Sequence, residues 1–215
     1  MLLPYLLRAA EFARGTFVEL GALDGNLFSN TNMLERCFNW TGLLIEANPE
    51  NAAKLVKSTR RASKVHSAVC EGVSQVNITR HGREVAGQPE LMSETHKKLW
   101  SSSAGSVAVP CRPLPSLMAG AGLLNATFLS LDVEGAEELV LQTVNPLDFG
   151  VIMVEMDGAN AAKDERVHSL LTGAGLSYSR KLAVKGSRVY LRPRRLMTVR
   201  ALRRKWEEQH KSLPH

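Results

Sequence analysis

The chain has 215 residues, of which 44% are hydrophobic and 22% are charged, values that exclude a mainly disordered, collagen-like or coiled-coil protein. Its formal net charge of +6 comes from residues 192–215, where eight basic and two acidic residues leave 19 of each sign in the rest of the chain. A neutral body makes nucleic acid an unexpected partner, because proteins that bind nucleic acid spread positive charge over a folded face. No apolar run approaches the roughly 20 residues of a membrane-spanning helix.

Short strands and helices alternate along the chain. Helical spacing of apolar residues predicts helices at 2–13, 29–38, 49–58, 115–121, 135–144 and 164–174. Compact apolar and β-branched runs predict strands at 16–20, 42–46, 64–69, 107–111, 126–131 and 151–155. Two more runs, 176–182 and 187–191, predict an antiparallel hairpin. We therefore predict an α/β fold with a doubly wound, mostly parallel, seven-stranded sheet whose ligand lies at the carboxyl ends of the strands.

Two stretches lie outside this alternation. Residues 71–106 are polar and rich in glycine and serine, which in a compact domain indicates a lid or a substrate loop, or else a disordered segment, and we favour a lid. Residues 192–215 carry apolar positions among basic ones, a pattern that predicts a charged terminal helix. We expect a single domain at 1–191 that includes the lid, followed by a basic tail.

Three cysteines are too far apart for a metal site or a redox motif. Cys37, Cys70 and Cys111 are separated by 33 and 41 residues, whereas zinc ligands and redox cysteines come in close pairs. We predict no metal site and favour three buried thiols. A Cys37–Cys70 disulfide is the alternative, and it would require an oxidising compartment.

Three N-x-T triplets begin at Asn39, Asn77 and Asn125. They would be acceptors for N-linked glycans if the chain entered the secretory pathway, but such triplets also arise by chance. The default location is therefore the cytoplasm, and the secretory pathway is the alternative if an N-terminal segment has been removed.

The first candidate site follows the strand at 16–20, where the sequence reads ELGALDG. Gly21 and Gly25 let backbone N–H groups approach a ligand at the start of a helix. The acidic Glu19 at the strand end would repel the pyrophosphate of NAD, but it suits a ligand with a positive charge, such as the sulfonium of S-adenosylmethionine. A plain tight turn is the alternative interpretation.

The second candidate is Glu46, which ends the strand at 42–46 and lies 21 residues after Gly25. A carboxylate at this point of a β-α-β unit accepts hydrogen bonds from the ribose hydroxyls of a nucleoside. Ser67 and Ala68, near the end of the next strand, are small enough to lie against an adenine or to serve only in packing.

The third candidate is a group of carboxylates after the strand at 126–131. Asp132, Glu134 and Glu137 lie within six residues, and like charges this close repel unless they have a counter-charge or a chemical task. Glu137 is expected in the first turn of a helix, where it favours the helix dipole. We expect Asp132 and Glu134 to contact an acceptor hydroxyl, with Glu155, at the end of the next strand, facing the same crevice.

Three segments closely resemble the FkbM family of S-adenosylmethionine-dependent methyltransferases: FVELGALDG at 17–25, GLLIEANP at 42–49 and LSLDVEGAE at 129–137. The resemblance covers about residues 16–191. It implies a class I methyltransferase fold and, most often, transfer of a methyl group to a hydroxyl of a sugar or a natural product.

The resemblance implies S-adenosyl-L-methionine as the cofactor and carries contacts with it over to Glu19, Gly21 and Glu46. Ala47 stands where the family often has proline, which is expected to alter the rigidity of the turn more than the chemistry. Ser29 or Asn30 is the predicted N-cap of the helix after the glycine turn. Together with the residues argued above, the expected cofactor site comprises Glu19, Gly21, Asp24, Gly25, Ser29, Asn30, Glu46, Ala47, Ser67, Ala68 and Asp132.

The resemblance assigns no catalytic base. From the residues alone we predict that Asp132 or Glu134 removes the hydroxyl proton, with Glu155 beside them and His81 of the lid in reserve. The expected acceptor is a small molecule or a glycan. Two other functions stay open: an NAD-dependent oxidoreductase, and a non-catalytic protein that docks on RNA or a membrane through its basic tail.

Overall fold

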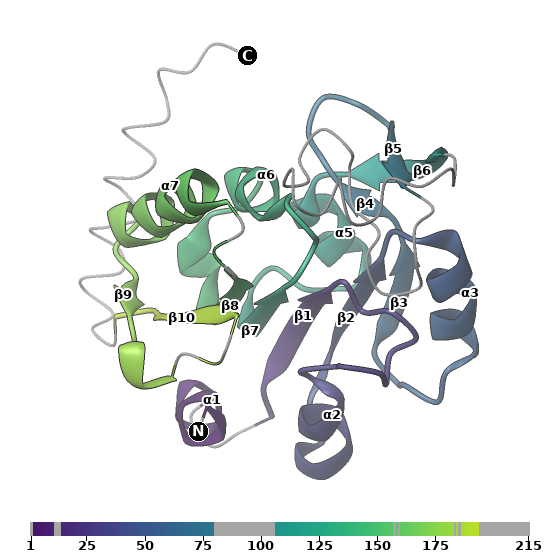
Figure 1. Ribbon diagram of the computed structural model, residues 1–215. Helices are drawn as coiled ribbons and strands as arrows, with labels where there is room; N and C mark the ends of the chain where they lie inside the picture. Colours follow the sequence, from purple (N-terminus) through teal and green to yellow (C-terminus); the bar gives the residue numbers. More distant parts are fainter. Residues whose placement is uncertain are drawn as a thin grey trace.

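A seven-stranded sheet forms the centre of the protein. The computed structural model in Figure 1 describes residues 2–10, 14–79, 106–156, 158, 160–182, 184 and 186–193. The main sheet has the order β3-β2-β1-β7-β8-β10-β9. Its strands are β1 (Thr16–Leu20), β2 (Thr41–Glu46), β3 (Ser63–His66), β7 (Ala126–Leu131), β8 (Phe149–Glu155), β9 (Ser177–Tyr178) and β10 (Ser187–Leu191). Pairings from β3 to β8 are parallel, and β10 pairs antiparallel with both of its neighbours.

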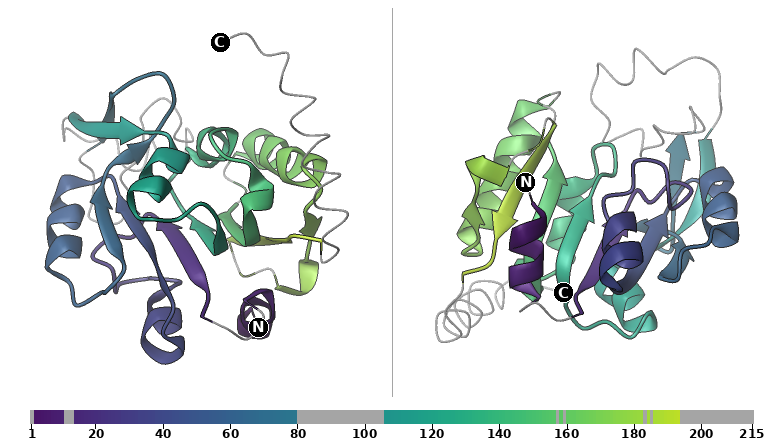
Figure 2. Two further views of the ribbon diagram at one scale, coloured as in Figure 1. Left: turned by 180° about the vertical axis from the view of Figure 1, so that it is seen from behind. Right: turned by 90° about the horizontal axis from the view of Figure 1, so that it is seen from below.

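Helices cover both faces of the main sheet (Figure 2). Successive side chains of a strand point to opposite faces, so Phe17 and Val18 of β1 belong to two different buried clusters. Residues of α1, α2 and α3 join the cluster of Phe17, and residues of α5, α6 and α7 join that of Val18. The bounds are α1 (Leu3–Ala9), α2 (Asn32–Phe38), α3 (Pro49–Lys57), α5 (Leu114–Gly120), α6 (Glu137–Gln142) and α7 (Ala161–Gly173), with 3-10 turns at Pro146–Asp148 and Arg180–Leu182.

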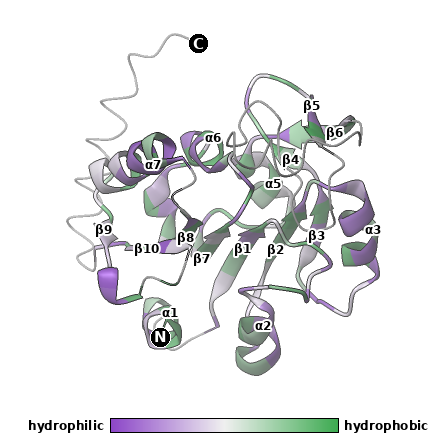
Figure 3. Ribbon diagram, in the orientation of Figure 1, coloured by the Kyte–Doolittle hydropathy of each residue, from purple (hydrophilic) through white to green (hydrophobic). Residues whose placement is uncertain are grey.

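This arrangement confirms the predicted α/β fold, with its mostly parallel seven-stranded sheet and its antiparallel C-terminal strands. The hairpin is shorter than expected, because β9 spans only Ser177–Tyr178 before the chain turns into a 3-10 helix. Figure 3 shows that the strands of the main sheet are among the most hydrophobic parts of the ribbon, as two covered faces require. Within the described residues, every helix is too short or too polar to cross a membrane.

A second sheet of three strands corrects the prediction for the middle of the chain. Its order is β4-β6-β5, with β4 at Ala68–Val69, β5 at Gln75–Thr79 and β6 at Ser106–Arg112. The strand predicted at 64–69 is therefore two strands separated at Ser67, and the strand predicted at 107–111 pairs outside the main sheet. The expected lid begins with β5, whose pairing with β6 buries the side chain of Ile78 in a third cluster. Residues 80–105, which include His81, lie outside the described residues, as does the tail from 194 onward.

Helix α2 begins three residues later than predicted. Ser29 and Asn30, the residues expected to cap it, lie in the loop before the helix and bond to the carboxylate of Glu19, while the Ser29 hydroxyl also accepts from the backbone N–H of Asn32, the first residue of α2. Thr31 occupies the N-cap position. Glu19 in β1 thus holds the loop that leads into the helix.

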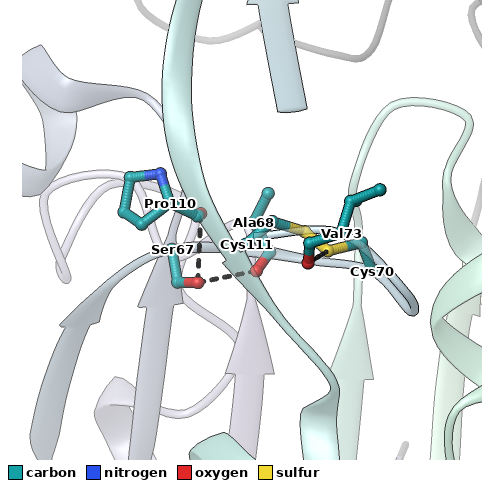
Figure 4. The surroundings of a disulfide bond; sticks show 6 residues. All are labelled: Ser67, Ala68, Cys70, Val73, Pro110 and Cys111. Carbon is teal, nitrogen blue, oxygen red and sulfur yellow. Dashed lines mark hydrogen bonds between the residues drawn. A yellow bond between two sulfur atoms is a disulfide. The ribbon is translucent and has the colours of Figure 1, made fainter. Parts of the chain in front are cut away.

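The cysteine predictions are wrong. Cys70 and Cys111 form a disulfide with a Cα–Cα distance of 5.7 Å (Figure 4). Cys37 is an exposed free thiol. Neither three buried thiols nor a Cys37–Cys70 pair is present. The disulfide joins the residue after β4 to β6, so it crosslinks neighbouring strands of the second sheet.

Candidate active site

A cavity of about 320 Å³ opens at the carboxyl ends of β1, β2 and β7, where a doubly wound sheet is expected to bind its ligand. Nine of the predicted site residues line it: Glu19, Gly21, Asn30, Glu46, Ala47, Ser67, Ala68, Asp132 and Glu134. Asp24, Gly25, Ser29 and Glu155 are not among the lining residues. The three sequence segments that pointed to a ligand therefore meet at one place, although they are up to about a hundred residues apart in the chain.

Gly21 brings the backbone of the first turn against the end of β7. Its φ of +77° lies in the left-handed region, and a Cβ atom built there would lie 2.0 Å from the carbonyl oxygen of Asp132. A side chain at this position would therefore separate β1 from β7 at the floor of the cavity. The amide nitrogens of Gly21 and Ala22 both donate to the carbonyl of Ile45, which fixes the turn on β2.

Glu46 is buried at the end of β2, with 5% of its surface exposed. Its Oε2 accepts from the backbone N–H of Leu23 at 2.7 Å, and its Oε1 accepts from that of Asn48 at 2.7 Å. Burial outweighs these bonds and raises the pKa of Glu46 to about 7, with a smaller contribution from the charge of Asp132. The carboxyl group is thus held rigidly at the cavity edge and titrates near neutral pH.

One wall of the cavity is apolar and comes from both sheets. It includes Ile45 at the end of β2, Ala68 and Val69 of β4, and Ile78 of β5. Ser67 also lies here, but it is fully buried and its hydroxyl donates to the backbone carbonyls of Ala68 and Pro110 (Figure 4). The wall is therefore apolar, and the Cys70–Cys111 disulfide belongs to the same buried cluster as Ala68 and Ile78 of the wall.

Glu19 does not present its carboxylate freely to the cavity. Its Oε2 accepts from the hydroxyls of Ser29 at 2.8 Å and Thr31 at 2.5 Å, and its Oε1 accepts from the backbone N–H of Asn30 at 2.7 Å. Burial raises the pKa of Glu19, while these bonds oppose the change. Asn30 in turn donates to the Ser130 hydroxyl at 3.0 Å, which ties the loop across β1 to β7. The contacts of Glu19 are those of a residue that positions the loop.

The glycine turn is stabilised by residues that do not reach the cavity. Asp24 accepts from the backbone N–H groups of Asn26 and Leu27, both at 2.8 Å, and these bonds lower its pKa. Gly25, with a φ of +84°, directs its carbonyl oxygen to the guanidinium of Arg60. Both residues therefore shape the loop from behind.

Arg60 supports the site from outside the cavity, and the sequence analysis did not single it out. Its side chain is fully buried and donates to the Ser29 hydroxyl at 2.9 Å and the Thr31 hydroxyl at 2.8 Å. It also pairs with Glu35 at 3.1 Å and lies 4.0 Å from Glu19. We call Arg60, Glu19 and Glu35 the arginine network. Its role could not be seen in the sequence, because Arg60 stands in a polar turn and its hydrogen-bond acceptors lie about 25–35 residues earlier, at positions 25–35.

Asp132, Glu134 and Glu155 form an acidic cluster on the other side of the cavity. Their carboxylate oxygens lie within 4.8 Å of one another, a spacing that allows them to share a proton or to hold a cation. Asp132 is exposed, and the other two are partly buried. Burial, together with the charge of Asp132 and a hydrogen bond to it, raises the pKa of Glu155 to about 9, so Glu155 is protonated at neutral pH.

Glu137 lies outside this cluster and has a structural role. It is fully buried, and its Oε1 accepts from the backbone N–H groups of Val133 and Gly135 at 3.3 and 3.0 Å. Lys163 of α7 supplies its counter-charge. This confirms the expectation that Glu137 lies in the first turn of α6, where its carboxylate bonds to the preceding loop.

The comparison with known proteins decides the family. The model of the methyltransferase FkbM domain matches residues 19–178, which include every segment that builds the cavity. The chain belongs to the FkbM methyltransferase family. The resemblance noted in the sequence is therefore confirmed, and the acidic cluster and the cavity belong to a methyltransferase domain.

Comparison with solved structures finds a distant similarity between this chain and another methyltransferase. Precorrin-6y C5,15-methyltransferase from Geobacter metallireducens GS-15 is 10% identical, with 87% of this chain and 84% of that chain covered and a TM-score of 0.42. No curated protein matches the sequence.

Proposed function

We propose that this FkbM protein is an S-adenosylmethionine-dependent O-methyltransferase whose acceptor is a hydroxyl of a sugar or another small molecule. The observation that carries the proposal is a single cavity in which a glycine turn, a buried strand-end carboxyl and an apolar wall adjoin a group of acidic side chains. The first three features suit a nucleoside, and the fourth suits proton removal.

The residues present fit the proposed cofactor. Glu46 would accept hydrogen bonds from ribose hydroxyls, and the wall of Ala68, Val69 and Ile78 would cover the adenine. The cavity volume of about 320 Å³ is within the range of about 300–1,000 Å³ that is usual for small-molecule sites. When bound, S-adenosylmethionine supplies an electrophilic methyl group on a positively charged sulfur.

The charge at the cavity favours this cofactor over NAD. Asp132 and Glu134 line the cavity beside Glu46, whereas Arg60 lies outside the lining and is enclosed by its own acceptors. A negative surface attracts a sulfonium and repels a pyrophosphate. The sequence analysis attributed the preference for a positively charged ligand to Glu19. In the structure the loop holds the Glu19 carboxylate, so this preference rests on Asp132 and Glu134.

The acidic cluster supplies the chemistry that a hydroxyl acceptor needs. Asp132 is the exposed member that lines the cavity, so its carboxylate accepts the hydroxyl proton as the acceptor oxygen takes the methyl group. Glu155, protonated at neutral pH, bonds to Asp132 and holds it in place. The remainder of the rate enhancement comes from aligning the acceptor and excluding water.

Transfer of a labelled methyl group to a panel of sugars and small hydroxylated compounds tests the proposal. Asp132→Asn should lower kcat by about 10²–10⁴-fold, the usual contribution of a general base, and should weaken cofactor binding much less, because Glu134 and Glu46 still line the cavity. The matched control is Glu138→Gln, which removes the same charge from a residue paired with Arg166 on the helix surface. Loss of activity in the control, or unchanged kcat in Asp132→Asn, would contradict the assignment.

A further inference from the structure

The Cys70–Cys111 disulfide is one of two independent indications of where this chain matures. Both cysteines are buried, with 2% and 1% of their surface exposed, and their bond crosslinks β4 to β6. Structural disulfides form and persist in oxidising compartments such as the endoplasmic reticulum and the extracellular space. A reducing cytosol would not maintain this crosslink.

The second indication is the structural setting of the three N-x-T triplets. Asn39, Asn77 and Asn125 are all exposed, and each is followed by threonine two positions later. In each triplet the middle residue, between the asparagine and the threonine, is buried: Trp40 and Ile78 are 1% exposed and Ala126 is 3% exposed. Each triplet therefore anchors its middle residue in a core and leaves the asparagine at the surface, as an acceptor for a bulky glycan requires.

Asn39 shows that the folded chain is compatible with such a group. It ends α2 with a left-handed φ of +54°, a conformation that asparagine tolerates better than most residues. Arg61 donates to its Oδ1 at 2.9 Å, which uses the carbonyl oxygen and not the amide nitrogen that a glycan would occupy. This hydrogen bond therefore uses the Oδ1 atom of Asn39, which a glycan on Nδ2 would leave in place.

All three sites point away from the cavity. Asn39 and Asn125 lie just before β2 and β7, at the amino end of strands whose carboxyl ends form the cavity. In β5, Ile78 lines the cavity, and the alternation of side chains sends its neighbour Asn77 to the opposite, exposed face. Glycans at these positions would leave the cofactor site open.

We propose that Asn39, Asn77 and Asn125 carry N-linked glycans and that the protein matures in the same oxidising, glycosylating compartment that forms its disulfide. In the modification, the side-chain nitrogen Nδ2 forms a bond to the anomeric carbon of an oligosaccharide. The bond from that carbon to a lipid-linked diphosphate breaks, the lipid diphosphate leaves, and Nδ2 loses one proton. The inference does not depend on the proposed catalytic function.

The test is made on the protein from the cells that produce it, detected with an antibody against the chain. Treatment with a peptide N-glycosidase should increase its electrophoretic mobility and convert asparagine to aspartate at positions 39, 77 and 125. A non-reducing digest should contain the peptide pair linked through Cys70 and Cys111. Unchanged mobility, or unmodified asparagines in the three peptides, would overturn the glycan sites, and alkylated Cys70 and Cys111 would overturn the compartment.

Variants of the full chain in the same cells separate the modification from any effect on folding. Thr41→Ala destroys the triplet at Asn39 but leaves the asparagine, whereas Thr41→Ser preserves the triplet, and Thr41 is exposed. The first variant should lose one glycan step and the second should keep it. Equal glycan numbers in both would show that Asn39 is not an acceptor.

Discussion

Two groups of charged residues flank the cavity, and they differ in almost every physical respect. The arginine network of Arg60, Glu19 and Glu35 is buried and combines opposite charges with hydroxyl and backbone partners. The acidic cluster of Asp132, Glu134 and Glu155 combines like charges and reaches the solvent. Carboxylates at the ends of neighbouring strands thus take different positions: that of Glu19 is held by a loop beside a buried guanidinium, whereas that of Asp132 lies at the exposed side of the cavity.

The largest effect should come from Arg60→Met. It would leave the buried Glu19 without its guanidinium partner and Glu35 with only the exposed Arg61, so the free energy of unfolding should fall by about 3–5 kcal/mol in urea denaturation. Arg166→Met is the matched control, because it breaks an exposed ion pair with Glu138 whose loss should cost at most about 1 kcal/mol. Similar losses in both variants would remove the distinction between a buried network and an ordinary surface pair.

The disulfide lies outside both charged groups and should affect binding without affecting catalysis. Replacing Cys70 and Cys111 together with alanine should lower the free energy of unfolding by about 2–4 kcal/mol, as is typical for a native disulfide. Because β4 forms part of the apolar wall, the Kd of the cofactor should rise while kcat at saturation stays nearly constant. A fall in kcat with unchanged Kd would place the disulfide in the chemistry of the acidic cluster.

Glu155 gives the acidic cluster a pH dependence that the arginine network lacks. Its pKa is raised to about 9, so it loses its proton only above that pH, and its new charge then repels Asp132. Activity should fall by up to about tenfold per pH unit above pH 9. Glu155→Gln mimics the protonated form and should remain active without this decline. An inactive Glu155→Gln variant would identify the Glu155 carboxylate itself as the base.

Glu46 should produce the smallest and most specific effect. Ribose hydroxyls donate to an ionised carboxylate, so cofactor binding should lower a pKa that burial has raised to about 7 and should release a proton. Affinity should therefore increase, by less than about tenfold, as the pH rises from about 6 to 8. Calorimetry in buffers of different ionisation enthalpy measures the released proton. In Glu46→Gln the pH dependence of the affinity should vanish. If it persists, Glu46 is not the residue that binds the ribose.

The sequence predicted the elements that follow local rules. Apolar runs closed by glycine or an acidic residue gave the parallel strands, and their carboxyl ends carry Gly21, Glu46 and Asp132, which meet at the cavity. Parallel strands place their carboxyl ends at one edge of the sheet, so the position of the site followed from the strand order. The resemblance to FkbM proteins rested on the same three strand ends.

Features that depend on residues far apart in the chain could not be predicted from the local sequence. Residues 107–111 have the pattern of a strand, but only the pairing with Ala68–Val69 and Gln75–Thr79 places it in a second sheet. Spacing alone does not determine which of three cysteines pair. In the sequence Arg60 resembles a solvent-exposed residue, but acceptors from residues 25–35 enclose it in the structure. Glu19 resembles a ligand contact, but its oxygens accept hydrogen bonds from the same loop.

Isothermal titration calorimetry with S-adenosylhomocysteine and with NAD, in separate titrations of the wild-type protein, tests the central claim most directly. A cavity with acidic residues beside a glycine turn should bind the adenosyl ligand at a single site and should give no saturable heat with NAD. Saturable binding of NAD together with no binding of S-adenosylhomocysteine would contradict the proposed methyltransferase site.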